Sequence, residues 1–199
     1  MYAPNLPHVG GTKDARQALK IRLGPTFRVV LALSLVLTSF WPFSAYAAAP
    51  LADGSTTFTI RIENISGDSK LPSPFAPGVW AVHDGDTKPL FDENDPDRGL
   101  GLAAIAEDGN PAELAANLVG TVGISSSGVF NTPAGADGPG PLFPGGAYEF
   151  DVKGNPGDYL SFATMYVQTN DVFSSPGENG IALFDESGSP IQGDITEYA

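Results

Sequence analysis

Glycine and proline are the residues that most limit what this chain can fold into. There are 24 Gly and 18 Pro among 199 residues, interspersed between short apolar stretches. Proline interrupts helices and central strands, and glycine supplies the backbone conformations that tight turns need. The composition therefore favours many turns over long helices, within a length that is typical of one domain.

Stretches with the patterns of β-strands lie between these turns. Apolar and polar residues alternate over residues 57–63, which is the period of a strand with one buried face. Residues 159–167 are apolar at nearly every position, as in a central strand covered on both faces. Other short strands are expected over residues 78–83, 146–152 and 180–185. Because strands and helices do not alternate in a βαβ rhythm, the sequence predicts an all-β fold, an antiparallel β-sandwich.

Helical patterns are confined to the middle of the chain. Residues 96–108 and 111–119 each begin at a proline that follows a capping residue and carry a stripe of leucine and other apolar residues. Asn110 and Glu113 have the spacing of a capping box around the start of the second helix. We expect two short helices that form an insertion in the sandwich, followed by an exposed Gly/Pro-rich loop over residues 132–141.

Residues 1–47 have the order of a secretory signal peptide. A basic stretch ends at Arg28, an apolar run covers residues 29–41, and small residues stand at positions 45 and 47. The apolar run is shorter than the roughly 20 residues that span a bilayer, and no second run of that length follows. We expect cleavage near Ala47 and a single, soluble, secreted or periplasmic domain over residues 48–199. The alternative is an uncleaved membrane anchor.

The charge of the chain also changes at residue 47, from a basic segment before it to an acidic one after it. Residues 48–199 contain five Lys and Arg residues against 22 Asp and Glu residues, a net charge of −17. Such a surface repels nucleic acid, whose binding depends on Lys and Arg neutralising phosphates, so nucleic-acid partners are not expected. Hard cations such as calcium suit clustered carboxylates. The absence of cysteine excludes disulfides, Cys-ligated zinc, iron–sulfur clusters and a thiol nucleophile.

Five motifs in order carry a resemblance to a known family. They are Trp80–Asp84, the stretch from Leu100 into Glu107-Asp-Gly109, Leu142–Gly145, Leu160–Met165 with Thr169-Asn-Asp171, and Leu183–Asp185. Together they resemble the spondin domain in its shorter bacterial form, over roughly residues 57–187. The resemblance implies a C2-like antiparallel β-sandwich that binds calcium at one end. Animal members of this family are modules of the extracellular matrix and of adhesion.

The resemblance also implies a set of calcium ligands. Glu107 corresponds to the family's acid in the turn after the helix, and Asp171 to the acid after the central strand, although the neighbouring proline and tryptophan are replaced here. A later family acid falls near Asn179, whose amide oxygen can ligate without charge, and Asp185 is the nearest compensating carboxylate. Carboxylates, carbonyls and water together provide the six to eight oxygens of a calcium site. The three acids equally suit a helix end, a loop and a turn.

The residues needed for common enzyme mechanisms are scarce. His83 is the one histidine in residues 48–199, so a His-rich zinc site cannot form there, and any Ser-His-Asp triad would have to use it. We expect His83 to be a packed, hydrogen-bonded residue and the protein not to be an enzyme. The acidic stretches 84–86 and 92–97 lack the glycine and final glutamate of an EF-hand, and are interpreted as a solvated surface.

The sequence thus predicts a secreted, calcium-binding, spondin-like module for adhesion or extracellular recognition. Its partner, an extracellular protein or glycan, is not identified by the residues. The alternative is a carboxylate-based hydrolase of an extracellular glycan or other surface polymer, because an acid-rich chain permits paired carboxylates.

Overall fold

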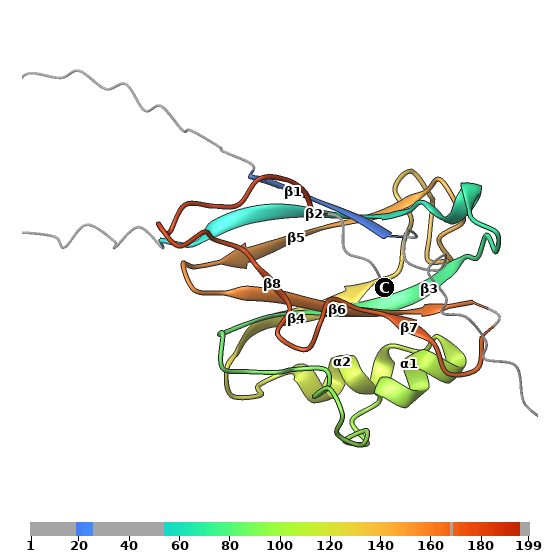
Figure 1. The fold of residues 1–199 in the computed structure, drawn as a ribbon, viewed down its shortest axis with the longest axis horizontal. Helices are drawn as coiled ribbons and strands as arrows, with labels where there is room; N and C mark the ends of the chain where they lie inside the picture. Colours follow the sequence, from blue (N-terminus) through green and yellow to red (C-terminus); the bar gives the residue numbers. More distant parts are fainter. Residues whose placement is uncertain (1–18, 26–53, 168, 196–199) are drawn as a thin grey trace, which may run out of the picture.

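The computed structural model describes residues 19–25, 54–167 and 169–195, which form two antiparallel sheets and a layer of two helices (Figure 1). Sheet A contains, in spatial order, β5 (Ala147–Gly154), β2 (Thr56–Asn64), β1 (Leu19–Pro25) and β9 (Gly193–Ile195). Sheet B contains β4 (Ile124–Phe130), β3 (Phe75–His83), β6 (Tyr159–Tyr166) and β7 (Phe173–Ser174), with β8 (Ile181–Ala182) also paired to β6. The expected all-β fold with a short helical insertion is therefore confirmed at this level, and the C2-like topology stays a prediction.

The main core lies between the two sheets. Phe58, Ile60 and Ile62 of β2 are fully buried, while the residues between them are partly exposed, which confirms the alternation expected for this strand. The opposite side of this core comes from sheet B, where Leu160 and Phe162 of β6 are also fully buried. Burial of these side chains is the main contribution that holds the two sheets together.

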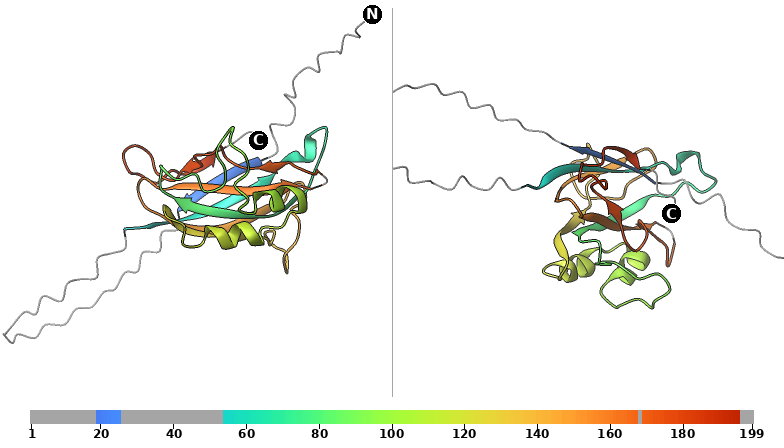
Figure 2. Two further views of the ribbon diagram at one scale, coloured as in Figure 1. Left: turned by 90° about the horizontal axis from the view of Figure 1, so that it is seen from below. Right: turned by 60° about the vertical axis from the view of Figure 1, so that its left-hand side comes forward.

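A second core lies between sheet B and the helices. Helix α1 (Leu102–Asp108) and helix α2 (Ala112–Leu118) lie on the face of sheet B that is turned away from sheet A (Figure 2). Their buried residues Ile105 and Leu114 pack in one cluster with Ala163 and Met165 of β6. Strand β6 is thus covered on both faces, as its continuous apolar sequence predicted.

Helix α1 begins later than the sequence indicated. Its first residue is Leu102, preceded by Gly101 in the left-handed conformation (φ 105°), and the residues expected to form its first turn lie in a loop instead. At α2, the Asn110 side chain accepts a hydrogen bond from the Ala112 backbone at 3.1 Å, but no capping box with Glu113 forms. A short 3-10 helix, η1 (Ser66–Asp68), follows β2.

Strand β1 lies within the segment that the sequence analysis assigned to the signal peptide and left without structure. It pairs antiparallel with β2 over seven positions, from Leu19 opposite Asn64 to Pro25 opposite Phe58. Its alternation of apolar and basic residues is compatible both with a strand and with the basic region of a signal peptide. Because the segment was interpreted as a signal peptide, the strand was not predicted. The apolar run over residues 29–41 lies outside the described residues. Among the described residues, no helix has the length and apolar character needed to cross a membrane.

The close approach of β3 to its neighbours gives a stability prediction. A Cβ atom on Gly78 would lie 2.2 Å from the Ala163 carbonyl oxygen and 2.4 Å from Cζ of Phe130. Gly78→Ala should therefore lower the free energy of unfolding by about 2 kcal/mol or more and Tm by about 5 °C. Gly138→Ala is the matched control, because a Cβ there has no neighbour within 4 Å. Equal thermal unfolding curves for both variants would contradict the packing described here.

Candidate functional site

Two of the four predicted metal ligands lie near the same end of β6. Glu107 is an exposed residue in the last turn of α1, two residues before Gly109, where a Cβ would lie 3.3 Å from Sδ of Met165. Asp171 is exposed in the loop between β6 and β7, next to Val172, whose carbonyl accepts a hydrogen bond from the Tyr166 backbone at 3.1 Å. The two residues thus belong to separate segments that both adjoin the C-terminal end of β6.

The other two predicted ligands lie near the opposite end of this strand. Asn179 precedes Gly180, where a Cβ would lie 2.7 Å from the Leu160 carbonyl oxygen at the start of β6. Asp185 lies two residues after Leu183, whose backbone N–H donates to the Asp158 carbonyl at 3.0 Å. A strand of eight residues is about 25 Å long, so the two pairs of predicted ligands do not meet.

Asp185 has a structural role where it lies. One of its carboxylate oxygens accepts hydrogen bonds from the backbone of Ser187 and Ser189, each at 2.9 Å, and from the Ser187 hydroxyl at 2.6 Å. These hydrogen bonds, that of the Ser187 hydroxyl foremost, lower the pKa of Asp185. The geometry is that of a turn closed by an aspartate, which the sequence analysis gave as the alternative for this residue.

Glu107 and Asp171 lie in segments next to the C-terminal end of β6. Among the described residues, the side chain of neither has a hydrogen-bond or ion-pair partner. In the same part of the chain, no group of three or more His, Cys, Asp and Glu side chains is arranged to hold a metal ion. A calcium ion here would depend on two carboxylates, with the remaining oxygens supplied by backbone carbonyls and water.

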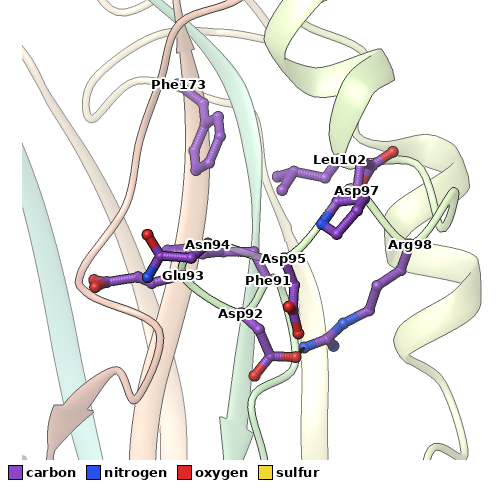
Figure 3. A pocket seen from close by; sticks show the side chains of 10 residues that line it. Phe91, Asp92, Glu93, Asn94, Asp95, Asp97, Arg98, Leu102 and Phe173 are labelled. Atoms are coloured by element: carbon purple, nitrogen blue, oxygen red, sulfur yellow. Dashed lines mark hydrogen bonds and ion pairs between the residues drawn. The ribbon is translucent and has the colours of Figure 1, made fainter.

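A second acidic region surrounds a shallow pocket beside helix α1. The pocket has a volume of about 270 Å³ and is lined by residues 91–98 with Leu102 and Phe173 (Figure 3). Phe91 and Phe173 meet edge to face with ring centroids 5.6 Å apart, and form an apolar floor with Leu102. Four acidic residues of the loop, Asp92, Glu93, Asp95 and Asp97, also line the pocket, together with Arg98.

Ion pairs hold the loop around this pocket in place. The Arg98 guanidinium binds the Asp92 carboxylate, as Figure 3 shows, and Lys88 Nζ lies 3.2 Å from the same residue. Both cations lower the pKa of Asp92, Arg98 more than Lys88. Lys88 also binds Glu178 at 2.6 Å, and Glu178 accepts a hydrogen bond from the Glu93 backbone at 2.6 Å. Sequence reasoning missed Glu178, because its partners lie far away in the chain and no local pattern links them.

His83 and Ser161 form a buried hydrogen-bonded pair in sheet B. His83 Nε2 lies 2.9 Å from the Ser161 hydroxyl, and Nδ1 lies 2.7 Å from the Asp84 carbonyl oxygen. Since a carbonyl only accepts, Nδ1 carries the proton and Nε2 accepts from the hydroxyl. His83 is 0% and Ser161 2% exposed, and the partner of Nδ1 is a backbone carbonyl, not a carboxylate. The pair therefore has the geometry of a packed core contact, as expected for His83.

Comparison of the chain with protein-family models, with curated proteins and with solved structures finds no match. The resemblance to the spondin domain therefore stays a prediction based on the motifs and their order.

Burial of His83 gives a prediction about the pH dependence of stability. Desolvation lowers the pKa of His83 below its ordinary 6.5, so the unfolded chain binds a proton more readily than the folded one. The free energy of unfolding should therefore fall as the pH drops from 7.5 to 5.5, and His83→Gln should show a smaller fall. Urea unfolding at the two pH values measures both. An identical fall in the variant would show that His83 does not titrate in this way.

Proposed function

We propose that this protein is an exported, non-enzymatic recognition module that binds calcium at the C-terminal end of β6. Glu107 and Asp171 are the proposed ligands, and the partner is an extracellular protein or glycan. The observation that supports the proposal is that these two exposed acids belong to α1 and to the loop between β6 and β7, two segments that adjoin the same end of the buried strand β6.

The charge of the domain supports a cation as the ligand. Residues 48–199 have a net charge of −17, and a negative surface of this size raises the local concentration of cations. Around the pocket, Asp92 and Glu178 pair with Arg98 and Lys88, whereas Glu93, Asp95 and Asp97 have no ion pair among the described residues. A calcium ion at Glu107 and Asp171 would likewise meet carboxylates that no cation of the described residues engages.

The role of the calcium ion would be to fix the loop between β6 and β7 against helix α1. A divalent cation shared by the two segments joins them through strong oxygen contacts and removes the repulsion between two negative charges. The surface formed by these segments would then be rigid only when calcium is bound. Calcium-dependent recognition of a partner follows from this coupling.

Calcium should therefore raise the thermal stability of the protein. A ligand that binds only the folded state stabilises it by about 2.7 kcal/mol at a hundredfold excess over Kd, which is several degrees in Tm for a domain of this size. Asp171→Asn and Glu107→Gln should each remove most of the increase. Calorimetry with EDTA and with millimolar calcium measures the effect.

The matched control is Asp95→Asn, which removes the same charge from an exposed position in the other acidic region. It should leave the calcium increment unchanged. A loss of the increment in Asp95→Asn, with none in Asp171→Asn, would place the cation at the pocket and contradict the proposed site. Turnover on a panel of glycans by the calcium-loaded protein would favour the hydrolase.

Export predicts a processed N-terminus. The protein recovered after export should begin near Ala48, because the small residues at positions 45 and 47 suit the peptidase that removes signal peptides. N-terminal sequencing measures this directly. Material that begins at Met1 would contradict both cleavage and the assignment of residues 1–47 to a leader.

A further inference from the structure

Strand β1 occupies an interior position of sheet A, although it belongs to the predicted leader. It lies between β2 and β9, and Figure 1 shows it alongside β2. Seven residues of β1 pair with β2, and three pair with β9, from Ile21 opposite Ile195 to Leu23 opposite Gly193. Within the described residues β9 pairs with no other strand. Strand β1 thus completes a sheet that the other described residues leave open.

Cleavage near Ala47 would separate β1 from the domain. Strand β2 would then lose its partner on one side while keeping β5 on the other, along the eight pairs from Thr56 opposite Gly154 to Glu63 opposite Ala147. The vacated side carries unpaired backbone N–H and C=O groups, which are a template for another strand. The inward residues of β2 are fully buried when β1 is present, so the same edge borders the main core.

We propose that the edge of β2 in the processed protein is a docking site for an extended segment of a partner protein, in which apolar residues alternate with polar ones and a basic residue lies opposite Glu63. This inference rests on the export step of the proposed function and is independent of calcium. The partner segment would add to sheet A in the position that β1 fills before cleavage, with main-chain hydrogen bonds giving affinity and alternate side chains giving specificity.

The register of β1 on β2 defines the pattern that this edge accepts. Ile21 and Leu23 are opposite Ile62 and Ile60, which face the main core, so apolar residues suit these positions. Lys20 of β1 is opposite Glu63 of β2, which lies on the outer face of β2. At the next alternate position Arg22 is opposite Arg61, so the register favours a basic residue opposite Glu63 and a polar residue at the other alternate positions.

The outer face of β2 and β5 carries three acids, Glu63, Glu149 and Asp151, against Arg61 and Lys153. Arg61 of β2 is already paired with Glu63 and with Glu149 of β5, and Asp151 of β5 accepts a hydrogen bond from Thr59 at 2.7 Å. A second copy of this chain is the less suitable occupant, because two processed domains with a net charge of −17 each repel one another.

The test uses protein recovered after export, with its N-terminus determined, and a fluorescent peptide with the sequence of Leu19–Pro25. The peptide should bind saturably by fluorescence anisotropy. A peptide of the same composition, with its apolar and basic residues gathered into two blocks, should bind at least about tenfold more weakly, which corresponds to about 1.4 kcal/mol. The uncleaved precursor is obtained with Ala47→Leu, and both proteins are measured in the same detergent. The precursor should bind the peptide at least tenfold more weakly than the processed protein, because β1 already occupies the edge.

A pair of variants locates the peptide on the protein. Glu63→Lys should weaken binding severalfold because it opposes a lysine in the β1 register. Asp137→Lys makes the same change in charge in the exposed loop between β4 and β5 and should have little effect. Equal weakening in both variants would mean that only the net charge attracts the peptide, and would overturn the proposal.

The remaining outcomes separate this proposal from the export step. An N-terminus near Ala48 without peptide binding overturns the docking edge and leaves the export proposal standing. An N-terminus at Met1 contradicts export and also the uncovering of β2. Binding that is equal in precursor and processed protein, or a processed protein that dimerises through β2 and excludes the peptide, overturns the proposal as well.

Discussion

The burial of β6 on both faces is the constraint on which the rest of the structure depends. One face packs against sheet A through Leu160 and Phe162, and the other packs against the helices through Ala163 and Met165. Because β6 is fixed from both sides, its two ends hold the adjoining loops at defined positions. The proposed calcium ligands Glu107 and Asp171 lie near one of these ends, and the loop that carries Asn179 lies near the other.

Local patterns in the sequence were enough to predict most of this architecture. The alternation in β2 and the continuous apolar run of β6 indicated their burial, and the capping residues indicated two short helices. The start of α1 was not predicted correctly, because contacts along and across the chain stabilise the loop before it. Arg98 and Lys88 pair with Asp92, and the distant Glu178 accepts a hydrogen bond from the Glu93 backbone. Strand β1 was missed because its alternation coincides with the basic region of a leader. The four predicted ligands lie near opposite ends of β6. The order of motifs in a sequence does not specify the distances between them in the fold.

The strong negative charge connects the two proposals. A net charge of −17 over residues 48–199 opposes compaction and self-association, and it favours positively charged ligands at several places. Around the pocket Arg98 and Lys88 pair with Asp92 and Glu178, while Glu93, Asp95 and Asp97 have no ion pair among the described residues; on the outer face of sheet A, Arg61 pairs with both Glu63 and Glu149. At the C-terminal end of β6, no cation of the described residues engages Glu107 or Asp171, and the calcium proposal depends on this.

Terbium luminescence tests the calcium site most directly. Terbium replaces calcium at oxygen sites, and a nearby tyrosine sensitises its emission. Tyr166 is the last residue of β6, and its backbone N–H donates a hydrogen bond to the carbonyl of Val172, the residue after Asp171. Titration of the processed protein should give saturable, tyrosine-sensitised emission that calcium displaces, and both Asp171→Asn and Tyr166→Phe should remove most of it. Sensitised emission that persists in both variants, or that is lost in Asp95→Asn instead, would contradict a calcium site at this end of β6.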